Sequence, residues 1–146
     1  MTSLFTFLDF SRLIVVNISN HMENIHFNEQ IRERTMNMAV DVRNLLKAEK
    51  FIAIDRPFVN QLIRSSSSVA ANYRSATRGR SDAEFYSKIC IVLEETDETL
   101  FWIDYLMKLE VLNEKESMKI RAEVEELVRL FSSIRKKMKE KIGGNG

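Results

Sequence analysis

The stretch Gln61–Arg80, QLIRSSSSVAANYRSATRGR, constrains the fold most. Its residues fit either a linker or a helix, and the choice between the two decides how the rest of the chain can pack. Four consecutive serines and a glycine near the end are typical of a linker. The apolar positions nevertheless recur at alternating steps of three and four once one serine is included, which is the spacing of a helix face. These positions are Val59, Leu62, Ser66, Val69, Tyr73 and Ala76. We therefore expect a helix whose small serines let a neighbouring helix approach closely.

The composition favours a single all-α domain. The 146 residues include only 4 Gly and 1 Pro, and 22 Lys+Arg nearly balance 21 Asp+Glu. Few helix breakers among many Leu, Met, Glu and Lys residues indicate helices. The near-neutral charge gives no global argument for a nucleic-acid or membrane partner. One cysteine excludes an intramolecular disulfide and fits a reducing compartment, so we expect a cytoplasmic protein without membrane contact.

Four helices are expected, with boundaries set by capping signals. Asp55 can cap the second helix and Pro57 suits its first turn. Ser81 and Glu84 form a capping box for the third helix, and Asn113 starts the fourth. The expected helices are 27–50, 57–77, 82–108 and 113–142. Short loops between helices of similar length predict an antiparallel up-down-up-down four-helix bundle.

The chain is expected to divide into an extension at 1–24, the bundle at 25–142 and a flexible tail at 143–146. Residues 4–18 are apolar, but Asp9 and Arg12 interrupt them and the stretch is too short to span a membrane. It lacks the basic start and the cleavage site of a signal peptide. We expect a poorly ordered extension, with Met22 as the natural start.

The second half of the third helix carries apolar groups in nearly every direction. Phe101, Trp102 and Tyr105 would leave a large aromatic patch in water if the bundle were a monomer. Burial of such side chains contributes about 1.5–3 kcal/mol each. These three residues therefore predict a homo-oligomeric interface. In the alternative, long charged side chains cover the patch on a monomer.

An acidic run on the third helix could suggest a metal site. Two-metal sites in helix bundles use Glu-x-x-His pairs, whereas His21 and His26 both precede the first predicted helix. We therefore expect no metal and no cofactor. The run is instead interpreted as part of a polar layer that fixes helix pairing. Its predicted members are Arg64, Asn72, Glu94 and Asp97.

No catalytic residues are predicted. The serines at 65–68 have no histidine within the four predicted helices to act as a base. Cys90 lies at an apolar-facing position and is expected in the core. The chain also lacks a glycine-rich loop that could hold phosphates.

Positive charge is concentrated near the ends of the second and fourth helices, which lie at the same end of an up-down bundle. The predicted nucleic-acid-binding residues are Arg74, Arg78, Arg80, Arg135, Lys136 and Lys137. Such a surface suits a phosphate backbone bound without sequence specificity. The ordinary alternative is the general preference of Lys and Arg for helix C-termini.

Three further features of the sequence form a recognisable set of motifs. They are Gln61-Leu62-x-Arg64-Ser65-Ser66-x-Ser68-Val69-x-x-Asn72 followed by Ala76, then Ser81-x-x-Glu84-Phe85, and then Glu94-Glu95-x-Asp97-Glu98-x-x-x-Trp102. Over residues 27–141 the chain resembles the bacterial four helix bundle protein family, whose members are also called ribosomal RNA intervening-sequence proteins. Many members carry Asn-Ile-x-Glu-Gly where this chain has Asn72-Tyr73-Arg74-Ser75-Ala76, so a role for that acidic residue does not transfer.

The resemblance implies an antiparallel four-helix bundle that assembles into a ring, often a homopentamer. It also implies similarity to the accessory variability proteins of diversity-generating retroelements, which are basic and assist a reverse transcriptase and nucleic acid. It supplies no catalytic residues. We therefore expect a non-enzymatic, ring-forming protein that associates with RNA or DNA backbone. The alternative is a structural scaffold oligomer that binds a protein partner without nucleic acid.

Overall fold

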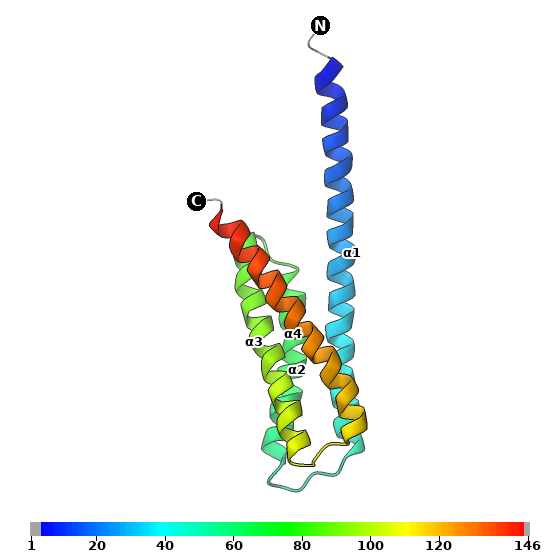
Figure 1. Cartoon of the computed structure of the whole chain (residues 1–146), viewed down its shortest axis with the longest axis vertical. Coiled ribbons are helices and arrows are strands. Elements are labelled where there is room, and N and C mark those ends of the chain that lie inside the picture. Colours follow the sequence, from blue (N-terminus) through cyan, green and yellow to red (C-terminus); the bar gives the residue numbers. More distant parts are fainter. Residues whose placement is uncertain (1–3, 145–146) are drawn as a thin grey trace. The chain divides into compact units, whose positions relative to one another are not determined.

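The computed structural model describes the backbone of residues 4–144 and the side chains of residues 24–144. Within that part the chain forms four helices (Figure 1). They are α1 (Leu4–Ala48), α2 (Arg56–Ala76), α3 (Asp82–Lys108) and α4 (Glu114–Gly143). The chain divides into two compact units, Met1–Glu33 and Arg34–Gly146, and the bundle described below lies in the second. The predicted all-α fold is confirmed.

The predicted start of the first helix is wrong. α1 begins at Leu4 and not near residue 27, while its end at Ala48 lies close to the predicted one. The prediction had set residues 1–24 aside as an extension outside the bundle, but a segment outside a bundle can still continue its first helix. Residues 1–3 and 145–146, and the side chains of residues 1–23, lie outside the described residues. The division into extension, bundle and tail therefore stays a prediction.

The serine-bearing stretch is helical, as expected. Each position of the predicted face is buried in α2, together with Ser65 and Ala70. The hydroxyl of Ser65 donates a hydrogen bond to the carbonyl of Leu62 at 3.3 Å, and that of Ser66 donates to Ile63 at 3.2 Å. Because these hydroxyls bond within their own helix, the serines can be buried without an unsatisfied polar group.

The start of α2 confirms one capping expectation and corrects another. Pro57 lies in the first turn as predicted, where its missing N–H costs no helical bond. Asp55 makes no side-chain cap hydrogen bond, because its backbone is already helical, at φ −86° and ψ −20°. An N-cap side chain reaches the first amides of a helix only from an extended backbone. The backbone carbonyl of Asp55 instead accepts hydrogen bonds from the amides of Phe58 and Val59, at 3.1 Å each.

α2 and α3 pack through small hydroxyl-bearing residues. Ser65, Thr96 and Thr99 are all fully buried. Thr96 bonds to the carbonyl of Val92 within α3 at 2.6 Å. The hydroxyls of Thr99 and Ser65 hydrogen-bond to each other at 3.0 Å, which links the two helices directly. Close helix approach at this position follows from the short side chains.

The ends of α3 and the start of α4 follow from local sequence. The Ser81 hydroxyl accepts from the Glu84 amide at 3.1 Å, and Asn113 caps α4 through the Glu116 amide at the same distance. Both caps confirm the prediction. After α3, Glu110 adopts a φ of 58°, the left-handed region that glycine usually supplies at a helix end. The Cβ of Glu110, which glycine would lack, therefore carries a steric cost there.

The remaining helix contacts complete an antiparallel bundle. Arg34 on α1 holds Glu123 on α4 with two hydrogen bonds of 2.9 and 3.0 Å. The rings of Tyr73 on α2 and Phe131 on α4 lie 5.4 Å apart, and both residues are fully buried. Within Arg34–Gly146, the α2–α3 turn and the end of α4 lie at one end, and the other two connections lie at the opposite end (Figure 1).

Candidate functional site

Two predicted groups of basic residues lie at the same end of the bundle, which we call the basic end. It consists of the end of α2 with its following turn, and the end of α4 (Figure 1). The end of α4 lies close to this turn, because Lys141 on α4 is 2.7 Å from the carboxylate of Asp82, the first residue of α3 after the turn. The geometry of the bundle thus agrees with the predicted placement.

Three of the six predicted basic residues surround one hollow. This arginine hollow has a volume of about 460 Å³ and is lined by Ala71, Arg74, Ser75, Arg78, Arg80 and Glu84. Sequence patterns had indicated the arginines but neither Ser75 nor Glu84. Among the residues whose side chains are described, no ion pair is formed by Arg74, Arg78 or Arg80. The positive charges of their guanidinium groups are therefore not neutralised by an ion pair within the described part of the chain.

The other three predicted residues lie on α4 outside the hollow. Arg135, Lys136 and Lys137 are exposed. A side-chain hydrogen bond with Cys90 raises the pKa of Tyr86 on α3, and the nearby positive charge of Arg135 opposes that shift only weakly. Cys90 is half-buried and not fully in the core. The basic end therefore has a hollow on the α2 side and an open helix surface on the α4 side.

The predicted interface aromatics form a cluster that includes one residue sequence reasoning missed. This aromatic cluster comprises Phe58, Phe101, Trp102 and Tyr105. Phe58 from α2 meets Tyr105 edge-on at 5.2 Å and Trp102 at 6.0 Å. Phe101 is 54% exposed. Phe58 had been missed because it lies in the first turn of α2, away from the serine-bearing stretch.

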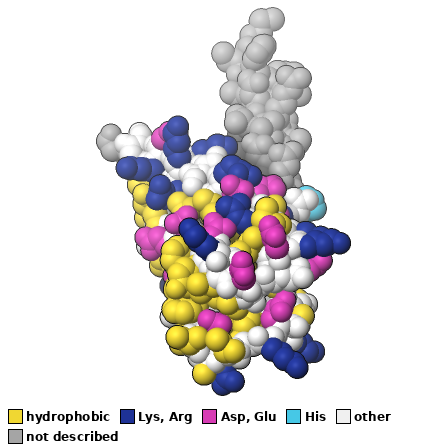
Figure 2. All heavy atoms as spheres, turned by 60° about the horizontal axis from the view of Figure 1, so that its bottom comes forward, with side chains coloured by type: hydrophobic (Ala, Val, Ile, Leu, Met, Phe, Trp, Pro, Cys, Tyr) yellow, Lys and Arg dark blue, Asp and Glu magenta, His cyan; other side chains and the backbone are white. Residues whose placement is uncertain are grey.

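A space-filling view shows hydrophobic side chains gathered over part of one face, with charged side chains around them (Figure 2). Exposed apolar residues of the described part include Phe101, Leu109, Ile52 and Ile54. Ile54 is 71% exposed in the connection before α2. An exposed apolar surface of this kind is typical of an interaction site.

The predicted polar layer has different members. Arg64 on α2 bonds to Glu95 at 3.2 Å and to Glu98 at 2.5 Å. The predicted partners Glu94 and Asp97 are exposed instead. Each true partner is the next residue along, and one residue turns a helix by about 100°. The prediction of two acidic residues three apart on α3 was therefore right, but it placed them on the wrong face of that helix.

Asn72 also differs from its predicted role, because its side-chain amide donates to the carbonyl and the hydroxyl of Ser68, both at 2.9 Å, within α2. Glu98 in turn accepts a hydrogen bond from the Trp102 indole at 3.1 Å. The bond from Arg64 lowers the pKa of Glu98 below its ordinary value. The polar network thus orients one ring of the aromatic cluster.

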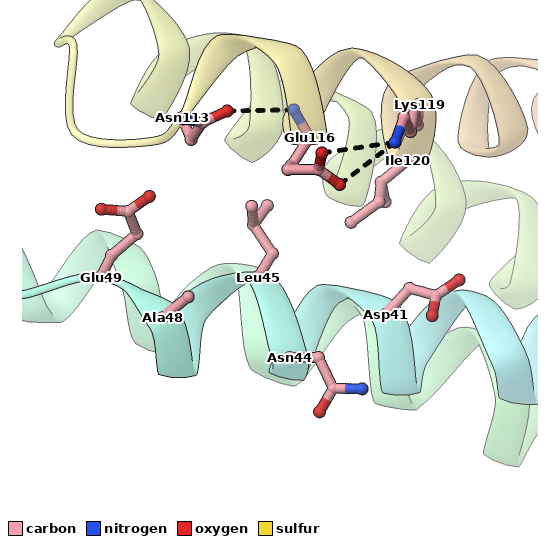
Figure 3. Close-up of a pocket in the computed structure, with 9 residues that line it drawn as sticks. All are labelled: Asp41, Asn44, Leu45, Ala48, Glu49, Asn113, Glu116, Lys119 and Ile120. Atoms are coloured by element: carbon pink, nitrogen blue, oxygen red, sulfur yellow. Dashed lines mark hydrogen bonds and ion pairs between the residues drawn. The ribbon is translucent and has the colours of Figure 1, made fainter.

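An acidic groove lies between the end of α1 and the start of α4, and sequence reasoning did not find it. It has a volume of about 550 Å³ and is lined by Asp41, Asn44, Leu45, Ala48, Glu49, Asn113, Glu116, Lys119 and Ile120. Leu45 and Ile120 point into the space between the helices, and Glu49 points toward α4 (Figure 3). Lys119 is 3.3 Å from Glu116, so it offsets only one of the three carboxylates.

Two further features, a metal-ligand cluster and a membrane-spanning helix, are absent from the described residues. Among them, no group of three or more His, Cys, Asp or Glu side chains is placed to hold a metal ion. In that same part of the chain, no helix is long and apolar enough to cross a bilayer.

The chain matches the family described as 23S rRNA-intervening sequence protein over residues 27–133. It is also similar to a solved structure, a protein with unknown function from the S23 ribosomal protein family of Bacteroides thetaiotaomicron VPI-5482. The sequence identity is 29% and the TM-score is 0.64, over 73% of this chain and 98% of that chain. No curated protein matches the chain. The family resemblance inferred from the motifs is thereby confirmed.

Proposed function

Because the chain belongs to the family of 23S rRNA-intervening sequence proteins, we propose that it is a non-enzymatic interaction protein that binds the phosphate backbone of RNA or DNA as a ring-shaped homo-oligomer. A homopentamer is the oligomer we expect first. Such a protein would work in the cytoplasm, where ribosomal RNA is found in bacteria. The basic end would hold the nucleic acid, and the aromatic cluster would join the subunits.

The convergence of positive charge at one end is the observation that carries the nucleic-acid proposal. Arg74, Arg78 and Arg80 line the hollow on one side of that end. Arg135 and Lys136 add exposed charge from α4 on the other side. A nearly neutral chain with a group of cations at one end can attract phosphates there without a high overall charge.

The aromatic cluster supports self-association. Three rings from α3 and one from α2 contact each other at the surface, and Phe101 is more than half exposed. Covering such a patch removes apolar area from water, which favours association by about 25 cal/mol per Å². Contact through this side of the bundle leaves the basic end free for nucleic acid.

The salt dependence of binding tests the proposal. We expect single-stranded RNA to bind at low salt with an affinity that falls as salt rises, by a slope of about −0.7 per phosphate contact in a log–log plot. Fluorescence anisotropy over a salt series gives this slope. A variant with Arg74, Arg78 and Arg80 changed to Gln should bind more weakly and with a shallower slope.

The matched control removes the same number of charges from the opposite end of the bundle, by changing Lys47, Lys50 and Lys108 to Gln. These residues lie near the other connections and should leave binding almost unchanged. No binding of RNA or DNA by the parent protein at low ionic strength would refute the proposed function. An equal loss in both variants would instead point to a general effect of net charge.

A scaffold that binds a protein partner is the second candidate function, and the acidic groove favours it. The groove joins an apolar floor of Leu45, Ala48 and Ile120 to the carboxylates of Asp41 and Glu49. That combination suits a basic, partly apolar protein segment, such as one from a reverse transcriptase. Changing Asp41 to Asn and Glu49 to Gln should weaken such a partner and leave RNA binding unaffected.

A further inference from the structure

We propose that the arginine hollow binds the terminal phosphate monoester of a nucleic-acid strand, rather than only the repeating phosphodiester backbone. This inference rests on the proposed function and assigns a specific role to one part of the basic end. The exposed residues of α4 would then supply the general attraction for internal phosphates.

The charge of the hollow matches that of a dianion. Three arginines and one glutamate, Glu84, line it, which leaves a net charge of two positive units. An internal phosphodiester carries one negative charge, whereas a phosphate monoester carries about −1.5 to −2 near neutral pH. A single monoester can therefore neutralise the hollow, while a single diester leaves it partly uncompensated.

Glu84 does not occupy the hollow as an ion-pair partner for the arginines. One of its carboxylate oxygens accepts a hydrogen bond from the backbone amide of Arg80 at 2.9 Å. Its own amide donates to the Ser81 hydroxyl at 3.1 Å. The carboxylate is thus engaged in capping the start of α3, and the guanidinium groups remain available for an external anion.

The backbone that carries Arg78 and Arg80 is held in one conformation. The amides of Thr77, Arg78 and Gly79 each donate to a carbonyl in the last turn of α2, at 3.0–3.1 Å. With the capping bonds of Glu84, these contacts fix both sides of the turn. A binding site fixed before the ligand arrives loses less conformational entropy when the ligand binds.

Gly79 allows a close approach within this turn. A Cβ at Gly79 would lie 3.1 Å from the carbonyl oxygen of Ala76, which is tighter than an ordinary contact, and 3.5 Å from the amide nitrogen of Phe85, which is an ordinary van der Waals distance. The Ala76 carbonyl belongs to the backbone, so the end of α2 would have to shift by a few tenths of an ångström to admit a side chain. The absence of a side chain therefore lets the turn between Arg78 and Arg80 pack closely against α2.

The residue types suit a phosphate with several free oxygens. A guanidinium group can donate two parallel hydrogen bonds to a phosphate, which an ammonium group cannot match in geometry. Ser75 adds a hydroxyl donor at the same hollow. A terminal monoester exposes three oxygens to such donors, whereas an internal diester exposes two.

Two short single-stranded RNAs of one sequence test the inference, one with a terminal phosphate monoester and one with a terminal hydroxyl. Competition for the full-length protein should show the monoester-ended RNA binding about tenfold tighter, which equals about 1.4 kcal/mol. The variant Arg78→Lys keeps the charge and loses the fork, so it should lose this preference while still binding long RNA. The matched control Arg135→Lys should keep the preference.

Each outcome decides the question. Equal affinity of the parent protein for the two RNAs overturns the inference but leaves the proposed function standing. Failure to bind either RNA overturns both. Inorganic phosphate should compete with the monoester-ended RNA better than chloride at equal ionic strength. If inorganic phosphate competes but the two RNAs bind equally, the hollow holds free phosphate and the assignment to a strand end is wrong.

Discussion

Replacing Phe101 by lysine tests whether the aromatic cluster joins subunits. The residue is 54% exposed, and an aromatic side chain presents about 150–250 Å² in total, so roughly 100 Å² remains in water. Covering that area at about 25 cal/mol per Å² would contribute about 2.5 kcal/mol for each subunit contact. The loss corresponds to close to two orders of magnitude in the association constant.

Lysine is chosen because its aliphatic stem can remain on Trp102 and Tyr105 while its ammonium group takes the exposed position. The isolated subunit should therefore stay folded, which circular dichroism and thermal melting can verify. Met118→Lys is the matched control, because Met118 is 48% exposed and lies on α4, which contributes no ring to the aromatic cluster.

Sedimentation velocity at micromolar concentration gives the result. We expect an oligomer for the parent protein and for Met118→Lys, and a monomer or a marked shift to lower mass for Phe101→Lys. A strictly monomeric parent protein would refute self-association, and an unchanged mass for Phe101→Lys would show that the interface lies elsewhere.

Three further predictions concern stability. Glu110→Gly should stabilise the fold by about 1 kcal/mol, because glycine relieves the left-handed backbone after α3; chemical denaturation measures it, and a loss of stability would contradict the reasoning. Thr99→Val should cost about 1 kcal/mol by removing the bond to Ser65, and an unchanged denaturation midpoint would count against that link. The hydrogen bond from Arg64 lowers the pKa of Glu98 in the folded state, so the stability that Glu98 contributes should be fully present above the ordinary glutamate pKa and be lost as pH falls through the lowered pKa. Arg64→Met should therefore make the free energy of unfolding less dependent on pH in the acid range. An identical pH profile of stability for parent and variant would show that Arg64 is not the cause of the lowered pKa.

Local signals were enough to place most of the bundle. The bounds of α3 agree with the prediction because Ser81 and Glu84 form a capping signal within four residues, and nothing distant is needed to interpret it. The burial of α2 followed from periodicity once Ser66 was counted with the apolar residues. Such short-range patterns predict structure well because the bounds and the buried face of a single helix depend on residues that are close in sequence.

The partners across helices could not be predicted in the same way. Two pairs of acidic residues on α3 have the same three-residue spacing, Glu94 with Asp97 and Glu95 with Glu98. Only the rotation of α3 about its axis relative to α2 decides that Arg64 meets the second pair. The acidic groove depends on the separation between α1 and α4, which no periodicity of either helix reports. Leu45 and Ile120 fit the apolar stripes of their own helices equally well with or without a gap between them.

The shared end of α2 and α4 has a consequence for binding strength once copies of the chain assemble. Cyclic symmetry points every subunit the same way, so a closed ring would carry its cationic sites as a repeated array on one side. A strand bound to one subunit would be presented to the site on the next subunit at an effective concentration that can reach millimolar. Several weak contacts to one strand would then combine into tight binding with slow dissociation. Avidity of this kind would make affinity rise steeply with strand length until the strand spans neighbouring copies.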